Sequence, residues 1–150
     1  MKIFLICKVR GASEEEIGKQ MAYVESLESM GHKVHWPHRD TKQNDPRRGT
    51  RICQTTFWAI FGAKEVHVIY DPTSEGFVAD MMMTFALNEL GKHKFFRLVG
   101  QRRIIIVNPE VVDRKIKEEM EQQIKKGIDP RFTKSYTMVL KNLADETANI

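Results

Sequence analysis

The stretch Lys2-Ile3-Phe4-Leu5-Ile6-Cys7 decides the fold, because five successive apolar side chains follow Lys2. A continuous apolar run of this length is typical of a strand buried on both faces, as in a parallel sheet. Residues 65–70 (Glu-Val-His-Val-Ile-Tyr) and 103–107 (Arg-Ile-Ile-Ile-Val) have the same character. The sequence therefore predicts a sheet built around these three strands.

Helical patterns separate the predicted strands. Ser13 is followed three residues later by Glu16, the spacing of a capping box, and apolar residues then recur at helical spacing as far as Gly31. Further helices are expected over residues 52–62, 77–90, 109–126 and 133–143, and further strands over residues 32–36 and 95–99.

Alternating strands and helices indicate an α/β protein. We expect a flavodoxin-like (Rossmann-like) three-layer sandwich with a mostly parallel five-stranded sheet of order 2-1-3-4-5. With 150 residues, the chain has the size of one domain.

Composition excludes several classes of protein. A chain that is 41% hydrophobic and 29% charged is neither disordered nor collagen-like. Two cysteines, Cys7 and Cys53, are too few for a disulfide framework and favour a reducing, cytoplasmic location. The apolar runs are too short to cross a bilayer or to form a signal peptide, so no membrane is expected.

The net charge of +4 is mild and spread along the chain, so it favours an anionic small molecule over nucleic acid. An acid-free basic stretch near residue 100 is interpreted as a solvated face; it contains Lys92, Lys94, Arg97, Arg102 and Arg103.

Ligands of open α/β sheets bind beyond the carboxyl ends of the strands, where the strand order reverses. Two connections begin at this edge of the sheet and lead into helix N-termini. One carries Arg10 and Gly11, and the other carries Ser74 and Gly76. Helix N-termini and arginine both bind phosphate. The alternative is that Arg10 is a surface charge and Ser74 merely caps a helix.

Asp80 lies one turn inside the third long predicted helix, among apolar residues. Burying a carboxylate there is costly unless it is paired or used. We expect the nearby helix N-terminus to keep it ionised, so that it can attack a sugar carbon as a base departs. The alternative is a helix-start charge that faces solvent.

Four stretches of the sequence resemble motifs of a known family in their order and spacing. They are Lys2–Cys7 with Val9-Arg10-Gly11, Gly31–Pro37, Ala63–Tyr70 and Ser74–Asp80. Through them the first 100 or so residues resemble the nucleoside 2-deoxyribosyltransferase-like family, and within it the 2′-deoxynucleoside 5′-monophosphate N-glycosidases. The C-terminal helices, from about residue 109 to 150, fall outside the resemblance.

The resemblance implies that Arg10, Gly11, Ser74 and Gly76 bind a phosphate and that Asp80 is the nucleophile. It also implies a homodimer and no cofactor. Two positions depart from the family pattern: Asp80 stands for a Glu, and Met82 for a Gly. In addition, Thr56 stands where the family has an Asp that contacts the sugar, and His38 is a further candidate for the ligand site.

Metal and dinucleotide sites are not expected. His32, His35 and His38 are three residues apart, and such positions on a strand face opposite sides. Gly11 belongs to no G-x-G-x-x-G fingerprint, which argues against a nicotinamide cofactor.

Three functions therefore remain open. The first is a nucleotide N-glycosidase or deoxyribosyltransferase, the second a catalytically impaired nucleotide-binding module of the same fold, and the third a basic α/β scaffold for nucleic acid or protein.

Overall fold

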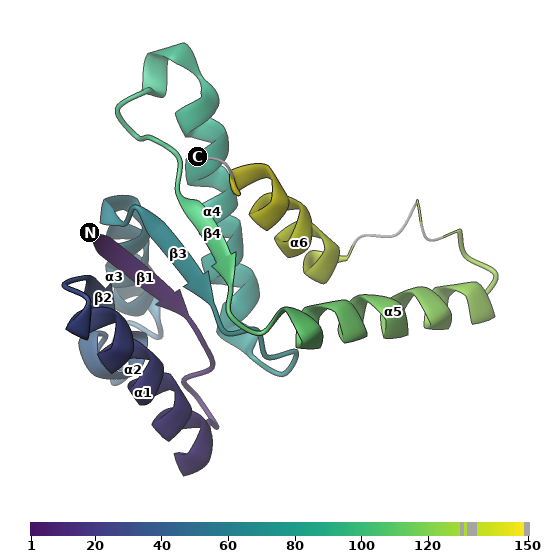
Figure 1. The fold of residues 1–150 in the computed structure, drawn as a ribbon, viewed down its shortest axis with the longest axis horizontal. Coiled ribbons are helices and arrows are strands. Elements are labelled where there is room, and N and C mark those ends of the chain that lie inside the picture. The colour runs from purple at the N-terminus through teal and green to yellow at the C-terminus, as the bar shows by residue number, and fades with distance from the viewer. Residues whose placement is uncertain (130, 132–134, 149–150) are drawn as a thin grey trace.

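A computed structural model describes residues 1–129, 131 and 135–148. Its centre is a sheet of four parallel strands in the order β2-β1-β3-β4 (Figure 1). In chain order the strands are β1 (Lys2–Ile6), β2 (Lys33–His35), β3 (Glu65–Val68) and β4 (Arg103–Ile106). The predicted α/β class and the reversal of strand order at β1 are confirmed.

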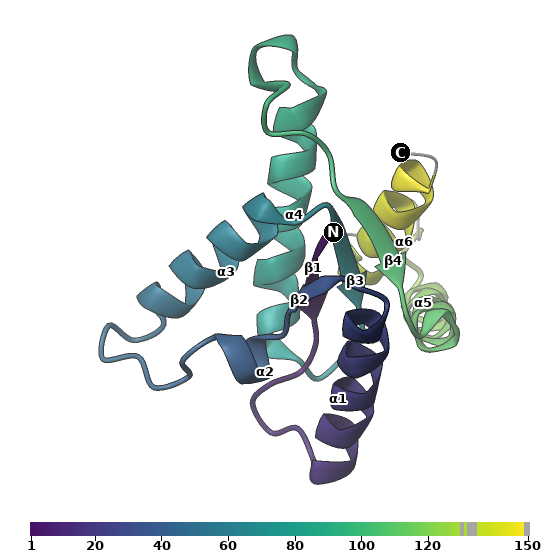
Figure 2. The ribbon, with the colours of Figure 1, turned by 60° about the vertical axis from the view of Figure 1, so that its left-hand side comes forward.

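The described part of the chain has six α-helices and one short 3-10 helix, of which α5 and α6 follow the last strand (Figures 1 and 2). They are α1 (Glu14–Ser29), α2 (Pro37–Asp40), α3 (Thr50–Gly62), α4 (Glu75–Lys92), η1 (Lys94–Phe96), α5 (Pro109–Lys125) and α6 (Tyr136–Thr147). None of them is long and apolar enough to span a membrane. The predicted capping box is present. The Glu16 carboxylate accepts the backbone N–H of Ser13 at 2.7 Å, and the Ser13 hydroxyl accepts the backbone N–H of Glu16 at 3.2 Å.

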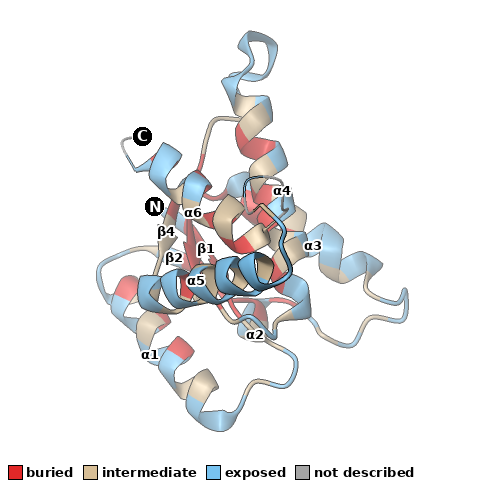
Figure 3. Cartoon of the chain, turned by 90° about the vertical axis from the view of Figure 1, so that its right-hand side faces the viewer, coloured by how far each residue is buried: buried red, intermediate tan, exposed pale blue. Residues whose placement is uncertain are grey.

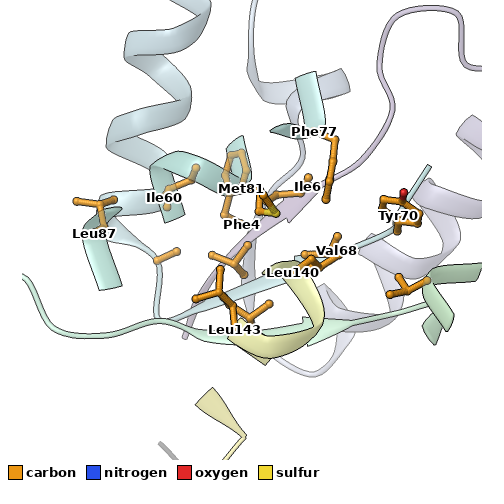
Figure 4. Close-up of a cluster of buried hydrophobic side chains, with 14 residues drawn as sticks. Phe4, Ile6, Ile60, Val68, Tyr70, Phe77, Met81, Leu87, Leu140 and Leu143 are labelled. Atoms are coloured by element: carbon orange, nitrogen blue, oxygen red, sulfur yellow. The ribbon is translucent and has the colours of Figure 1, made fainter. Parts of the chain in front are cut away.

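Two apolar layers cover the sheet, because successive residues of β1 face opposite sides. Ile3 and Leu5 pack against α1. Phe4 and Ile6 pack on the other side in a larger cluster with residues of α3, α4 and α6 (Figure 4). The C-terminal helix α6 thus supplies core side chains, including the fully buried Leu140.

The expectation of five strands is wrong. Residues 95–99 are not part of the sheet. They lie beyond the C-terminal end of α4, partly in η1, in the segment that turns back toward β4 (Figure 3). Phe95 and Leu98 are almost fully exposed there. The apolar run at residues 95–99 has the composition of a strand, but it pairs with no strand. The strand that pairs with β3 is β4, which begins at Arg103.

Arg102 also departs from the prediction, because it is 1% exposed and belongs to no solvated face. Its guanidinium donates to the carbonyl oxygens of Ile60, Phe61 and Gly100 at 3.1, 2.7 and 2.9 Å. Two of these carbonyls belong to the last turn of α3, and that of Ile60 also accepts the backbone N–H of Ala63 at 3.1 Å. Arg102 therefore caps the C-terminus of α3 from inside the protein.

Candidate functional site

A cavity of about 560 Å³ opens beyond the carboxyl ends of β1 and β3. Its volume is in the range of small-molecule sites. It lies between the loop after β1, the N-terminal turns of α4 and the segment that joins α2 to α3. Its lining is Cys7, Val9, Arg10, Gly11, Pro37, Thr41, Gln43, Arg48, Gly49, Ile52, Cys53, Thr56, Thr73, Ser74, Glu75, Gly76, Ala79 and Asp80.

One end of the cavity brings together the two loops expected to bind phosphate. Arg10 and Gly11 line it from the loop after β1, and Gly11 takes a left-handed conformation (φ 69°) that favours glycine. The loops are joined by an ion pair, with Lys8 Nζ 3.4 Å from Asp71 Oδ2. Burial acts to raise the pKa of Asp71, but hydrogen bonds from Thr73 and the Lys8 charge hold it below its usual value.

Ser74 and Gly76 face the same end from the start of α4. Ser74 is the N-cap residue, yet its hydroxyl makes no capping hydrogen bond. The reading that Ser74 merely caps the helix therefore does not hold. The hydroxyl and the first amides of α4 are donors without intrahelical acceptors, and Arg10 lines the same cavity.

Asp80 lines the deeper part of the cavity. Within the described residues its carboxylate has no hydrogen bond or ion pair, and burial raises its pKa from 3.8 to about 7. The expectation that the helix N-terminus keeps Asp80 fully ionised is therefore wrong. Asp80 lies in the second turn of α4, beyond the first turn where the dipole is strong.

Two further groups lie against this part of the cavity. Thr56, from α3, is only 4% exposed, and its hydroxyl has no hydrogen-bond partner in the described part of the chain. An unpartnered buried hydroxyl is uncommon, which marks it as a group that a ligand would satisfy. Cys7 is also buried, and desolvation raises the pKa of its thiol to about 12, so it stays a neutral thiol.

The segment between α2 and α3 also lines the cavity, with Thr41, Gln43 and Arg48. Sequence reasoning did not single out Gln43 or Arg48. The only signal for them was that residues 38–50 formed a polar segment longer than an ordinary connection.

The cavity does not include every expected side chain. His38 is half-buried beside Trp36, with ring centroids 5.5 Å apart, and does not line the cavity. Trp36 is in the core, where its Nε1 donates to Gln20 at 3.0 Å. Trp58 lines a separate hollow on the outer side of α3. None of the three lines the cavity.

Among the described residues, no three His, Cys, Asp or Glu side chains gather closely enough to hold a metal ion. Comparison with protein families, curated proteins and solved structures finds no match. The functional interpretation therefore depends on the geometry of the cavity and on the motifs in the sequence.

Proposed function

We propose that the chain cleaves the N-glycosidic bond of a nucleoside or deoxynucleoside 5′-monophosphate, as the resemblance to the nucleoside 2-deoxyribosyltransferase-like family suggests. The observation that carries the proposal is the meeting of Arg10, Ser74 and Asp80 in one cavity. Phosphate donors at one end and an unpartnered carboxylate deeper inside match a sugar phosphate bound by its anionic end.

In the proposed reaction the phosphate binds Arg10, the Ser74 hydroxyl and the first amides of α4. Asp80, in its ionised form, attacks C1′ of the sugar while the C1′–N bond breaks, and the base leaves with the electron pair of that bond and takes up a proton. Water then attacks C1′ and releases the carboxylate. Over both steps one water is consumed, with its hydroxyl on C1′ and its other hydrogen on the base.

A pKa of about 7 suits this role. A carboxylate with so high a pKa is poorly solvated in its ionised form, so it is a better nucleophile than a surface aspartate. The same value also means that a large part of the protein carries a neutral, unreactive Asp80 at neutral pH.

A second candidate function is nucleotide binding without turnover. The observation that favours it is the Asp at position 80, where the family has Glu. Asp is one methylene shorter, so its carboxylate oxygens reach roughly 1.5 Å less far from the backbone of α4. A displacement of about 1 Å can lower a rate by about 100-fold.

The test is to incubate the protein with several 5′-monophosphates and to measure free base and sugar 5-phosphate by chromatography. We expect base release that Asp80→Asn abolishes and that is much weaker for the matching nucleosides without phosphate. Binding without release, seen as a rise in melting temperature, would favour the second candidate. Neither binding nor release of any monophosphate would refute both.

A further inference from the structure

Asn108 holds the residue that follows β3, although it is placed to cap its own helix. It is the N-cap residue of α5, but within the described residues its side chain makes no capping hydrogen bond. Its Oδ1 accepts the backbone N–H of Tyr70 and its Nδ2 donates to the Tyr70 carbonyl oxygen, both at 2.8 Å. An amide side chain can pair in this way with both polar groups of one residue. Asn108 therefore continues the pairing of β3 with β4 as far as Tyr70.

The Tyr70 hydroxyl is tied to the two C-terminal helices. Tyr70 and Thr137 are 5% and 3% exposed, and their hydroxyl oxygens lie 3.0 Å apart. The Thr137 hydroxyl donates to Oε1 of Glu119 at 3.2 Å, and a hydroxyl has only one proton to donate. The Tyr70 hydroxyl is therefore the donor to Thr137. A directed chain of hydrogen bonds thus runs from Tyr70 through Thr137 in α6 to the Glu119 carboxylate in α5.

Tyr70 contacts both ends of a loop that reaches the cavity. Residues 71–74 follow it in the chain, and Ser74 and Gly76 line the cavity at the start of α4. At the far end of the loop, the ring of Phe77 packs edge-on against the Tyr70 ring, with centroids 5.0 Å apart (Figure 4). A shift of Tyr70 is therefore passed to the first turn of α4.

We propose that Asn108 and Thr137 are positioning residues for the ligand of the cavity. They hold Tyr70 from the two helices that follow the last strand, and Tyr70 holds the loop that carries the Ser74 hydroxyl. The C-terminal helices then contribute to binding as well as to the core. The proposal rests on the proposed function, because it takes Ser74 and the first amides of α4 as the groups that bind the phosphate.

The alternative is that Thr137 only anchors α6 to the sheet. Thr147 provides the comparison, because it anchors the other end of the same helix. It is also 3% exposed, and its hydroxyl accepts the backbone N–H of Ile104 in β4 at 2.9 Å. This bond holds β4 and not the loop that follows β3. If anchoring α6 were the whole role of Thr137, the loss of either hydroxyl would have the same consequences.

Thr137→Val removes the hydroxyl in the middle of the chain and keeps the branched shape of the side chain. Hydrogen exchange without ligand measures the opening of residues 71–76, and calorimetry measures the affinity for deoxyribose 5-phosphate. We expect exchange roughly tenfold faster and affinity roughly tenfold lower than in the parent protein. Asn108→Ala should act in the same direction on both. Thr137→Ser keeps the hydroxyl and should restore both values.

Thr147→Val is the matched control. Each valine variant leaves a buried partner without its hydrogen bond, so both should lower the melting temperature by a few degrees. Only Thr137→Val should change the exchange of residues 71–76 and the affinity. Tyr70→Phe removes the donor of the same hydrogen bond, so adding it to Thr137→Val should cost little further affinity. If Thr137→Val does not fold, Tyr70→Phe takes its place in the comparison.

Two results would overturn the proposal while leaving the proposed function intact. One is an equal loss of affinity in the two valine variants, and the other is a Thr137→Val protein that binds deoxyribose 5-phosphate as tightly as the parent does. If the parent protein binds neither this ligand nor any 5′-monophosphate, the proposed function fails and the role in ligand binding fails with it. The exchange measurement still shows in that case whether Thr137 holds the loop.

Discussion

Lys8 and Asp71 join the two loops that bring Arg10 and Ser74 to the cavity, with Nζ 3.4 Å from Oδ2. Lys8 follows β1 and Asp71 follows β3, and these strands are neighbours in the sheet. Lys8 also lies 3.7 Å from Glu16 of α1. Both members of the Lys8–Asp71 pair are largely shielded from solvent, so the pair can fix how far Arg10 lies from Ser74.

Lys8→Met should therefore weaken the binding of a phosphate-bearing ligand, with a small loss of folding stability. We expect a several-fold loss of affinity for deoxyribose 5-phosphate, measured by calorimetry, because the Arg10 loop is no longer held. The free energy of unfolding should fall by only about 1 kcal/mol, since the pair is partly exposed. The exposed pair of Lys19 and Glu15 provides the control, and Lys19→Met should leave the affinity unchanged.

The raised pKa of Asp80 predicts a pH dependence of activity. Attack on C1′ needs the ionised carboxylate, so base release at saturating substrate should increase as the pH rises through about 7 and level off above it. A rate that is independent of pH between 6 and 8 would argue against Asp80 as the nucleophile.

The same pKa shift predicts that Asp80 lowers stability at high pH. Its pKa is raised on folding from 3.8 to about 7, so the folded protein binds the proton more tightly than the unfolded chain does. The contribution of Asp80 to the free energy of unfolding is fully present below about pH 4 and is lost as the pH rises through 7. Asp80→Asn should thus be stabilising at pH 8, by at most about 4 kcal/mol and less where water enters the cavity. Denaturant unfolding at pH 4 and pH 8 measures the difference, which should be near zero at the lower pH.

Much of the fold could be predicted because its signals are local, whereas phosphate binding by Arg10 and Ser74 stays a prediction. The apolar run at Ile3–Cys7 and the Ser13–Glu16 spacing need no knowledge of tertiary contacts. Residues 95–99 misled the prediction because a short apolar run does not tell a strand from an exposed tip. Gln43 and Arg48 were missed because only the folded loop between α2 and α3 brings them to the cavity.

Arg102 offers a test of the buried cap on α3. Arg102→Met keeps a long apolar side chain but removes the donor of the Phe61 carbonyl and leaves the Ile60 carbonyl with the Ala63 backbone N–H alone. We expect a loss of about 2–4 kcal/mol in the free energy of unfolding, measured with urea. Arg97→Met, at an exposed position of the same basic stretch, should change it by less than about 0.5 kcal/mol. Equal effects of the two variants would mean that the cap contributes nothing.

Exposed apolar side chains on α3 and α4 allow a test of the homodimer or larger oligomer that the family resemblance implies. Trp58 is 65% exposed, and Phe61 and Met82 are also exposed on these two helices. Large apolar side chains gathered on adjoining helices are typical of an interface, and the family resemblance implies a homodimer. We therefore propose that α3 and α4 form the dimer interface. Trp58→Arg should convert a dimer to a monomer in sedimentation experiments at micromolar concentration. Met21→Arg, an exposed apolar position on α1, should leave the mass unchanged. A parent chain that sediments as a monomer would refute the proposal.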